Sequence, residues 1–152
     1  MTTNEMNIEK LNRLIQINED RKAGYLKAYE QTDEPDLKAL FDKYSKQSGM
    51  YIVDLGVAVE SYGGVPTDKS SLTGDMYRAW MDIKEALATN ERKAVLESCE
   101  RGEDAAVSTY SDVLEDSMEL DQNLIGIITM QAREIGHAHD EIKALRDSAK
   151  LN

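Results

Sequence analysis

Residues 35–64 read PDLKALFDKYSKQSGMYIVDLGVAVESYGG, and this stretch decides the fold class. Pro35 stands where the first turn of a helix tolerates proline, and the pair Gly63-Gly64 supplies the backbone freedom that a helix C-terminus needs. Between them, apolar residues recur every three or four positions, which is the period of an amphipathic helix. The stretch therefore predicts a helix over residues 35–62 with one apolar stripe. The stripe comprises Leu37, Phe41, Tyr44, Tyr51, Ile52, Leu55, Val59 and Tyr62, and Ser48 interrupts it.

The same period runs through the rest of the chain, and no stretch shows the β-branched alternation of strands. Clusters of proline, glycine and small polar residues separate the periodic segments. Helices are predicted over residues 4–31, 35–62, 72–88, 91–116 and 119–149, and residues 63–90 form a long crossover that contains its own helix. Four long helices with one such crossover, between the second and third bundle helices, are typical of ferritin-like topology. We therefore predict one all-α domain over residues 1–152, a ferritin-like antiparallel four-helix bundle.

Charge and composition exclude several classes of partner. The chain has 152 residues, and 18 Lys and Arg against 29 Asp and Glu give a net charge of −11. This charge repels phosphate backbones and anionic lipid, so we expect no nucleic-acid partner and no membrane partner. The single cysteine cannot form an internal disulfide, and no segment resembles a signal peptide or a membrane span. We expect a cytoplasmic protein.

Polar side chains interrupt the apolar stripes near the middle of the predicted helices when each helix is drawn on a wheel of about 100° per residue. These side chains are Glu19, Lys22, Glu103, Tyr110, Gln131 and His139. A buried ionisable group is costly unless it is paired or hydrogen-bonded, so we expect these residues to form a buried polar network. Glu19, Glu103 and His139 are predicted to lie in one layer between the helices.

Three interpretations of this polar layer stay open. Ion pairs and hydrogen bonds, extended by water and by the hydroxyl of Tyr25 or Tyr110, would fix the register of the helices. A metal ion is the second interpretation, because carboxylates and imidazole are metal ligands. Partial exposure is the third, because positions at the edge of a stripe often reach solvent.

Two further features are interpreted as structural. Glu134-x-x-His137 has the spacing with which carboxylate di-iron bundles aim a carboxylate and an imidazole at a metal pair. On the helical wheel, however, His137 lies nearly opposite Ile135, so the motif is interpreted as a coincidence. Cys99 lies on an apolar face, and we expect a small core residue rather than a nucleophile.

The segments LESCERGED at residues 96–104 and HDEIKALRD at 139–147, with Gly24-Tyr25 and Trp80, carry a family resemblance. The chain resembles a bacterial family of short ferritin-like four-helix bundles that is classed as a domain of unknown function. The resemblance covers nearly the whole chain and implies kinship with stress-associated ferritin-like proteins. It implies a fold and no settled activity.

Ferritin-like enzymes hold two metal ions with single carboxylates from two helices and a Glu-x-x-His from each of the other two. The resemblance implies that Glu19 and Glu103 stand for the single carboxylates and that His139 is the inward imidazole. The second predicted helix instead offers Asp54 with Val57 where a histidine would stand. We expect a non-enzymatic, structural or stress-related protein with no cofactor. The alternative is an iron- or manganese-binding protein, or a di-iron oxidase relative, with a partial site at Glu19, Glu103 and His139.

Val53 and Val57 lie on the face of the second predicted helix opposite its core side, and an apolar strip is left over there. Exposed valines are ordinary on protein surfaces, so the strip can simply be solvated. The crossover helix is a second possible cover, since its own apolar stripe needs a surface. That stripe comprises Met76, Trp80, Ile83 and Leu87. The third possibility is a homo-oligomer seam, or more generally a site for a protein partner.

Overall fold

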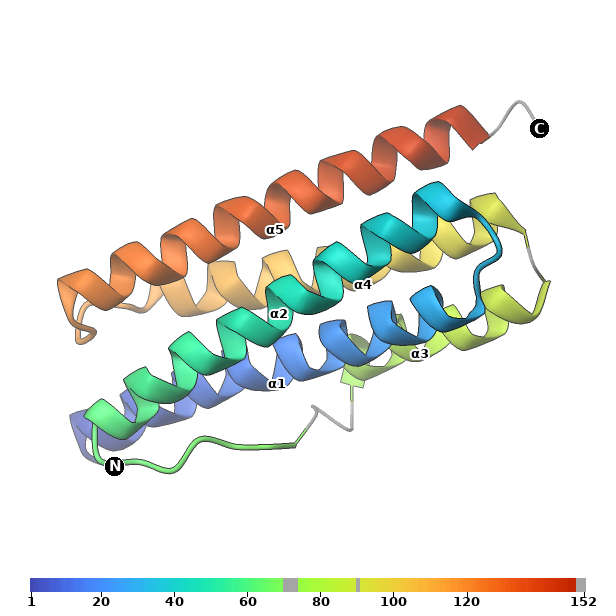
Figure 1. The fold of residues 1–152 in the computed structure, drawn as a ribbon. Helices are drawn as coiled ribbons and strands as arrows, with labels where there is room; N and C mark the ends of the chain where they lie inside the picture. The colour runs from blue at the N-terminus through green and yellow to red at the C-terminus, as the bar shows by residue number, and fades with distance from the viewer. Residues whose placement is uncertain (70–73, 90, 150–152) are drawn as a thin grey trace.

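The computed structural model describes residues 1–69, 74–89 and 91–149, and this part of the chain contains helices and no strand. The elements in Figure 1 are α1 (Thr3–Gln31), α2 (Pro35–Ser61), α3 (Gly74–Thr89), α4 (Arg92–Glu115) and α5 (Gln122–Ala149). The all-α prediction is confirmed, as is a bundle with a short helix between its second and third long helices. The predicted start of the crossover helix at residue 72 lies outside the described residues.

Local chemistry explains most of the helix ends. The Thr2 side chain caps α1 by accepting a hydrogen bond from the Glu5 amide at 3.1 Å. Pro35 occupies the first turn of α2, and Gly63 adopts a φ of +83° just beyond its end. The largest difference from prediction is at α5, which starts three residues later than residue 119. A turn in which the Leu120 amide donates to the Ser117 carbonyl occupies this segment instead.

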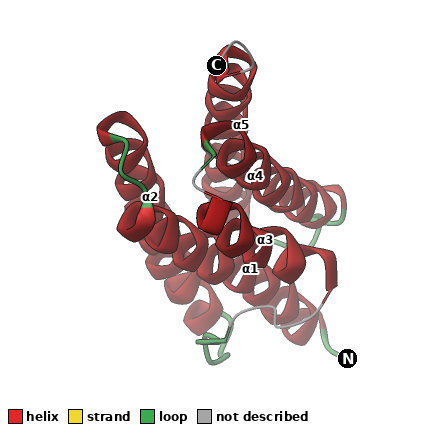
Figure 2. Ribbon diagram, turned by 90° about the vertical axis from the view of Figure 1, so that its right-hand side faces the viewer, coloured by secondary structure: helices red, strands yellow, loops and turns green. Residues whose placement is uncertain are grey.

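The four long helices form two antiparallel hairpins, α1 with α2 and α4 with α5 (Figure 1). Within the bundle, α1 lies at the centre and packs against α2, α3 and α4 (Figure 2). In contrast, α2 and α5 diverge in that view, and they pack only weakly on each other. The arrangement therefore leaves one open side, between α2 and α5.

The crossover helix α3 covers the opposite side of the bundle by packing against α1 and α4. Its Trp80 is 1% exposed and fits between two glycines, Gly24 of α1 and Gly102 of α4. A Cβ atom at either glycine would lie only 2.5 Å or 2.6 Å from the Trp80 ring. Glycine at both positions is thus what lets the indole approach the two helix backbones this closely.

The position of α3 decides whether the crossover helix covers Val53 and Val57 of α2. Trp80, Ile83 and Leu87 are buried against α1 and α4 as a stripe, whereas the Met76 side chain lies outside the described residues. Val53 and Val57 of α2 are each 65% exposed. The interpretation that the crossover helix covers these valines is therefore wrong, because α3 lies against other helices.

The prediction that Cys99 is a core residue is confirmed, since its side chain is fully buried and forms no disulfide. Burial raises the pKa of the Cys99 thiol above its ordinary value, and the nearby Glu103 carboxylate adds to this shift. The neutral thiol is accordingly an unreactive core group. Within the described part of the chain, none of the helices combines the length and apolar character that a bilayer crossing demands.

Candidate functional site

A buried ion pair joins the two hairpins at the centre of the bundle. Arg21 of α1 donates from Nε to Glu103 Oε1 at 2.7 Å and from Nη2 to Glu103 Oε2 at 3.0 Å. Both side chains are 0% exposed. Burial acts to lower the pKa of Arg21, but the Glu103 carboxylate raises it above its ordinary value, so the guanidinium stays charged. Two parallel hydrogen bonds are the geometry that best offsets the desolvation of such a pair.

Hydrogen bonds extend this pair to all four long helices. Arg21 Nη1 donates to Ser48 Oγ of α2 at 2.9 Å, and Ser48 Oγ donates to Asn18 Oδ1 at 2.9 Å. Asn18 Nδ2 in turn donates to the Tyr110 hydroxyl at 2.8 Å, and that hydroxyl donates to Gln131 Oε1 of α5 at 2.7 Å. We call these residues the core polar network. Its members are Asn18, Arg21, Ser48, Glu103, Tyr110 and Gln131.

Aromatic rings enclose the Arg21 end of the core polar network. The Arg21 guanidinium carbon lies 5.4 Å from the ring centroids of both Tyr25 and Tyr44, within the range of a cation–π contact. The Trp80 ring meets the Tyr25 ring edge-on, with centroids 5.0 Å apart. Burial, followed by the Glu103 charge, raises the pKa of the Tyr25 hydroxyl well above its ordinary value. The hydroxyl is therefore neutral and adds no second negative charge beside Glu103.

The structure brings together three of the six residues predicted for the polar layer. Glu103, Tyr110 and Gln131 are fully buried members of the core polar network. Lys22 needs a correction, because its side chain is exposed, and Glu19 is partly exposed. Arg21, the residue just before Lys22, provides the positive charge that the sequence reasoning assigned to Lys22.

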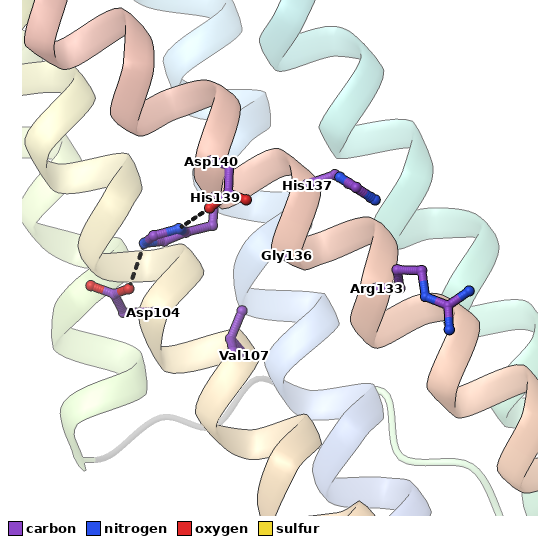
Figure 3. A pocket seen from close by; sticks show the side chains of 7 residues that line it. All are labelled: Asp104, Val107, Arg133, Gly136, His137, His139 and Asp140. Carbon is purple, nitrogen blue, oxygen red and sulfur yellow. Dashed lines mark hydrogen bonds and ion pairs between the residues drawn. The ribbon is translucent and has the colours of Figure 1, made fainter.

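His139 lies at the edge of the bundle rather than in a central layer. Its Nε2 lies 2.8 Å from Asp104 Oδ1 of α4, its Nδ1 lies 3.1 Å from Asp140 Oδ1, and its side chain is 22% exposed. Figure 3 shows His139 directed toward Asp104, whereas His137 and Arg133 point away from it on the other side of α5. The expectation that His139 shares a buried layer with Glu19 and Glu103 is therefore corrected. His137 is exposed, as predicted from the wheel.

The candidate ligands Glu19, Glu103 and His139 are not assembled into a metal site. Among the described residues, no three histidine, cysteine, aspartate or glutamate side chains are grouped so that they could hold a metal ion. Both Glu103 oxygens accept hydrogen bonds from Arg21, whose positive charge would repel a cation. The residues at this level fit an ion pair and do not fit the metal centre of a di-iron protein.

A family model described as "Domain of unknown function (DUF2383)" matches residues 6–116. The chain belongs to this family. The matched residues span nearly all of α1 and the whole of α2 to α4, and they include Arg21 and Glu103, whereas α5 lies beyond them. No curated protein matches the sequence. The resemblance to a family of unknown function is thus confirmed, and the family description assigns no activity.

Tyrosine side chains connect α2 and α5 across the open side of the bundle. The Tyr51 hydroxyl donates to Glu134 Oε1 at 2.5 Å, and the Tyr44 hydroxyl donates to Glu141. Near the end of α2, the Tyr62 hydroxyl accepts from the Asp121 amide at 3.0 Å. We call these three contacts the tyrosine bridges. They are a feature that sequence reasoning missed, because the tyrosines were assigned to the apolar stripe and their hydroxyls were given no partner.

The tyrosine bridges predict an alkaline loss of stability. Burial, followed by the hydrogen bond to Glu134, raises the pKa of Tyr51 above its ordinary value of 10.0. Because the folded state favours the protonated hydroxyl, this contribution is fully present below the unfolded pKa of about 10 and is lost as the pH rises beyond it. We expect Tyr51→Phe to lose about 1 kcal/mol at neutral pH and to show a shallower decline above pH about 10. Urea unfolding across this pH range measures both effects.

Glu134→Gln is the matched control for this prediction. It keeps an acceptor for the Tyr51 hydroxyl but removes the carboxylate charge, so its alkaline decline should lie between those of the wild type and Tyr51→Phe. A Tyr51→Phe protein that follows the wild-type decline would contradict the assignment.

Proposed function

We propose that this member of the DUF2383 family is a non-enzymatic, structural helical protein that works by binding protein. The observation that carries the proposal is the Arg21–Glu103 pair, because the charged groups of the core neutralise each other instead of facing a substrate. Ion pairs of this kind specify how helices assemble and supply no free acid, base or nucleophile. The proposal retains the ferritin-like kinship and the stress-related role that the resemblance implies.

A protein is the partner that the surface favours. The exposed apolar residues of α2 lie on its outer face and those of α5 lie beside α2, where a polypeptide could cover them. The net charge of −11 disfavours nucleic acid and anionic membrane. The proposal also keeps a cytoplasmic location, which the single unpaired cysteine favours.

Metal analysis can distinguish the alternative function, iron or manganese binding, from the proposed one. We expect protein purified without a histidine tag to carry no stoichiometric iron or manganese by elemental analysis. We also expect its thermal midpoint to stay unchanged when either ion is added, because a ligand stabilises only the state that binds it. Near-stoichiometric metal that is lost in Glu103→Gln would overturn the proposal and favour the metal-binding alternative.

A further inference from the structure

Exposed apolar side chains lie on the outer face of α2 and beside its contact with α5. Met50, Val53 and Val57 of α2 are 68%, 65% and 65% exposed, and Ile127 and Met130 of α5 are 39% and 51% exposed. Large apolar side chains with this exposure are individually ordinary, but a continuous strip of them is typical of an interaction surface.

Hollows between α2 and α5 are bordered by four of these residues, Met50, Val57, Ile127 and Met130, whereas Val53 lies on the outer face of α2. One hollow lies between Met50 and Met130, and the next along the helices lies between Val57 and Ile127. Asp54 lines both hollows, so they are neighbours along the two helices. A third hollow continues the row toward the start of α2, past Tyr44 and Glu141. The tyrosine bridges cross between the two helices along the same course, so the row of hollows is a built feature of the fold.

One face of α2 has the pattern of a helix that pairs with a copy of itself. Five exposed residues follow one another at intervals of four, three, four and three positions, which is the spacing of a helix–helix seam. They are Lys46, Met50, Val53, Val57 and Glu60. The three central residues are apolar. Lys46 at one end is positively charged and also lies 2.9 Å from Asp42 of its own helix, and Glu60 at the other end is negatively charged. We call this row the α2 stripe.

We propose that the outer face of α2 binds a second copy of this chain, with the two α2 stripes antiparallel about a two-fold axis near Val53. The argument rests on the proposed function, in which this face binds protein. In an isologous pair, residue i meets residue j and residue j meets residue i. An axis at Val53 places each Lys46 opposite Glu60 of the second copy, and each Met50 near Val57 of the second copy. The charge order of the stripe is therefore self-complementary.

Salt dependence separates this interface from one held by ion pairs. Each chain carries a net charge of −11, so two copies repel each other. Dissolved salt screens this repulsion strongly. The apolar centre of the stripe is insensitive to that screening. We expect the dimer to strengthen as salt rises from low to physiological concentration.

Sedimentation velocity over a range of protein concentrations tests the proposal directly. We expect the wild type to shift from monomer toward dimer with concentration, and Val53→Glu to remain a monomer under the same conditions. Met118→Glu is the matched control, because Met118 is 92% exposed in the loop before α5, and it should associate like the wild type. A wild type that is monomeric at every concentration and salt level would overturn the proposal.

Charge exchange tests the antiparallel geometry itself. Lys46→Glu alone and Glu60→Lys alone should each weaken the dimer at least tenfold, since each brings like charges together twice. The double variant should recover association, and an equimolar mixture of the two single variants should form a heterodimer. If neither the double variant nor the mixture recovers association, the assigned geometry is overturned.

Photo-crosslinking separates failure of this inference from failure of the proposed function. A photoreactive phenylalanine analogue at residue 53 of the full chain, in the producing cell, should yield an adduct of twice the mass of the chain. An adduct of another mass would show a different protein on this face, which overturns the second copy and leaves the proposed function standing. A chain that yields no adduct and stays monomeric would overturn both.

Discussion

Arg21→Leu is expected to lower the free energy of unfolding by about 3 to 5 kcal/mol, because it leaves the Glu103 carboxylate buried and unpaired. Both side chains are fully buried, so solvent screens neither charge. The loss also removes the Arg21 donor to Ser48, one of the two hydrogen bonds that connect α1 and α2 within the core polar network. Equilibrium urea unfolding followed by circular dichroism measures the change.

The double variant Arg21→Leu/Glu103→Leu is the control that separates the cost of an unpaired buried charge from the cost of altered packing. It removes both buried charges, and an apolar pair of similar size can be neutral in place of a buried ion pair. We therefore expect the double variant to recover most of the stability lost by Arg21→Leu. Losses that simply add in the double variant would show that the two side chains do not interact in the folded protein.

Trp80→Ala is expected to cost a similar amount, about 3 to 5 kcal/mol, because it leaves a large cavity between α1, α3 and α4. The ring is almost completely buried and is held at Gly24 and Gly102. Thermal and urea unfolding should both report the loss. A change below about 1 kcal/mol would contradict the placement of α3 against the two helices.

Substitution of Gly102, which contacts the Trp80 ring, tests the same packing independently. Gly102→Ala should destabilise the wild type by about 1 to 3 kcal/mol, because the new methyl group overlaps the rigid indole. In the Trp80→Ala background the same change should instead stabilise by up to about 1 kcal/mol, because alanine is the better helix residue. Gly136→Ala on α5, where a Cβ meets open space, should stabilise both backgrounds alike. A Gly102→Ala effect of the same sign in both backgrounds would contradict the assigned contact.

Sequence reasoning succeeded best for α2, where one stripe is buried and the rest is open. Its apolar residues Phe41, Tyr44, Leu55 and Val59 are buried as predicted, and its outer valines are exposed. A single-stripe wheel describes this helix well because only one of its faces packs on the bundle.

The same method failed for α1 for a physical reason. This helix packs against α2, α3 and α4, so its buried arc is much wider than one stripe. The wheel selected Lys22, whose side chain is exposed, and passed over Arg21, whose side chain is fully buried. The row Leu14, Asn18, Arg21, Tyr25 and Ala28 has helical spacing and was visible in the sequence. What the sequence does not show is how many neighbours a helix will have.

For α5, the wrong placement of His139 in a central layer had the opposite cause. This helix packs chiefly on α4, so its buried stripe is narrow and follows Leu124, Ile128, Gln131, Ile135, Ala138 and Ile142. His139 lies one position away from that stripe and reaches Asp104 at the edge. Whether a residue at the border of a stripe meets core or solvent depends on the partner helix, which spacing alone does not reveal.

The Arg21–Glu103 pair places one buried charge in each hairpin, and this affects whether either half of the chain can fold alone. A fragment that holds only α1 and α2 contains a cation in its apolar face, and one that holds only α4 and α5 contains an anion there. Neither half can close its own apolar face without burying a lone charge, so each is a poor folding unit by itself. A chain divided between α2 and α3 should therefore behave as a split protein whose two pieces fold together, because only assembly pairs the buried Arg21 with the buried Glu103.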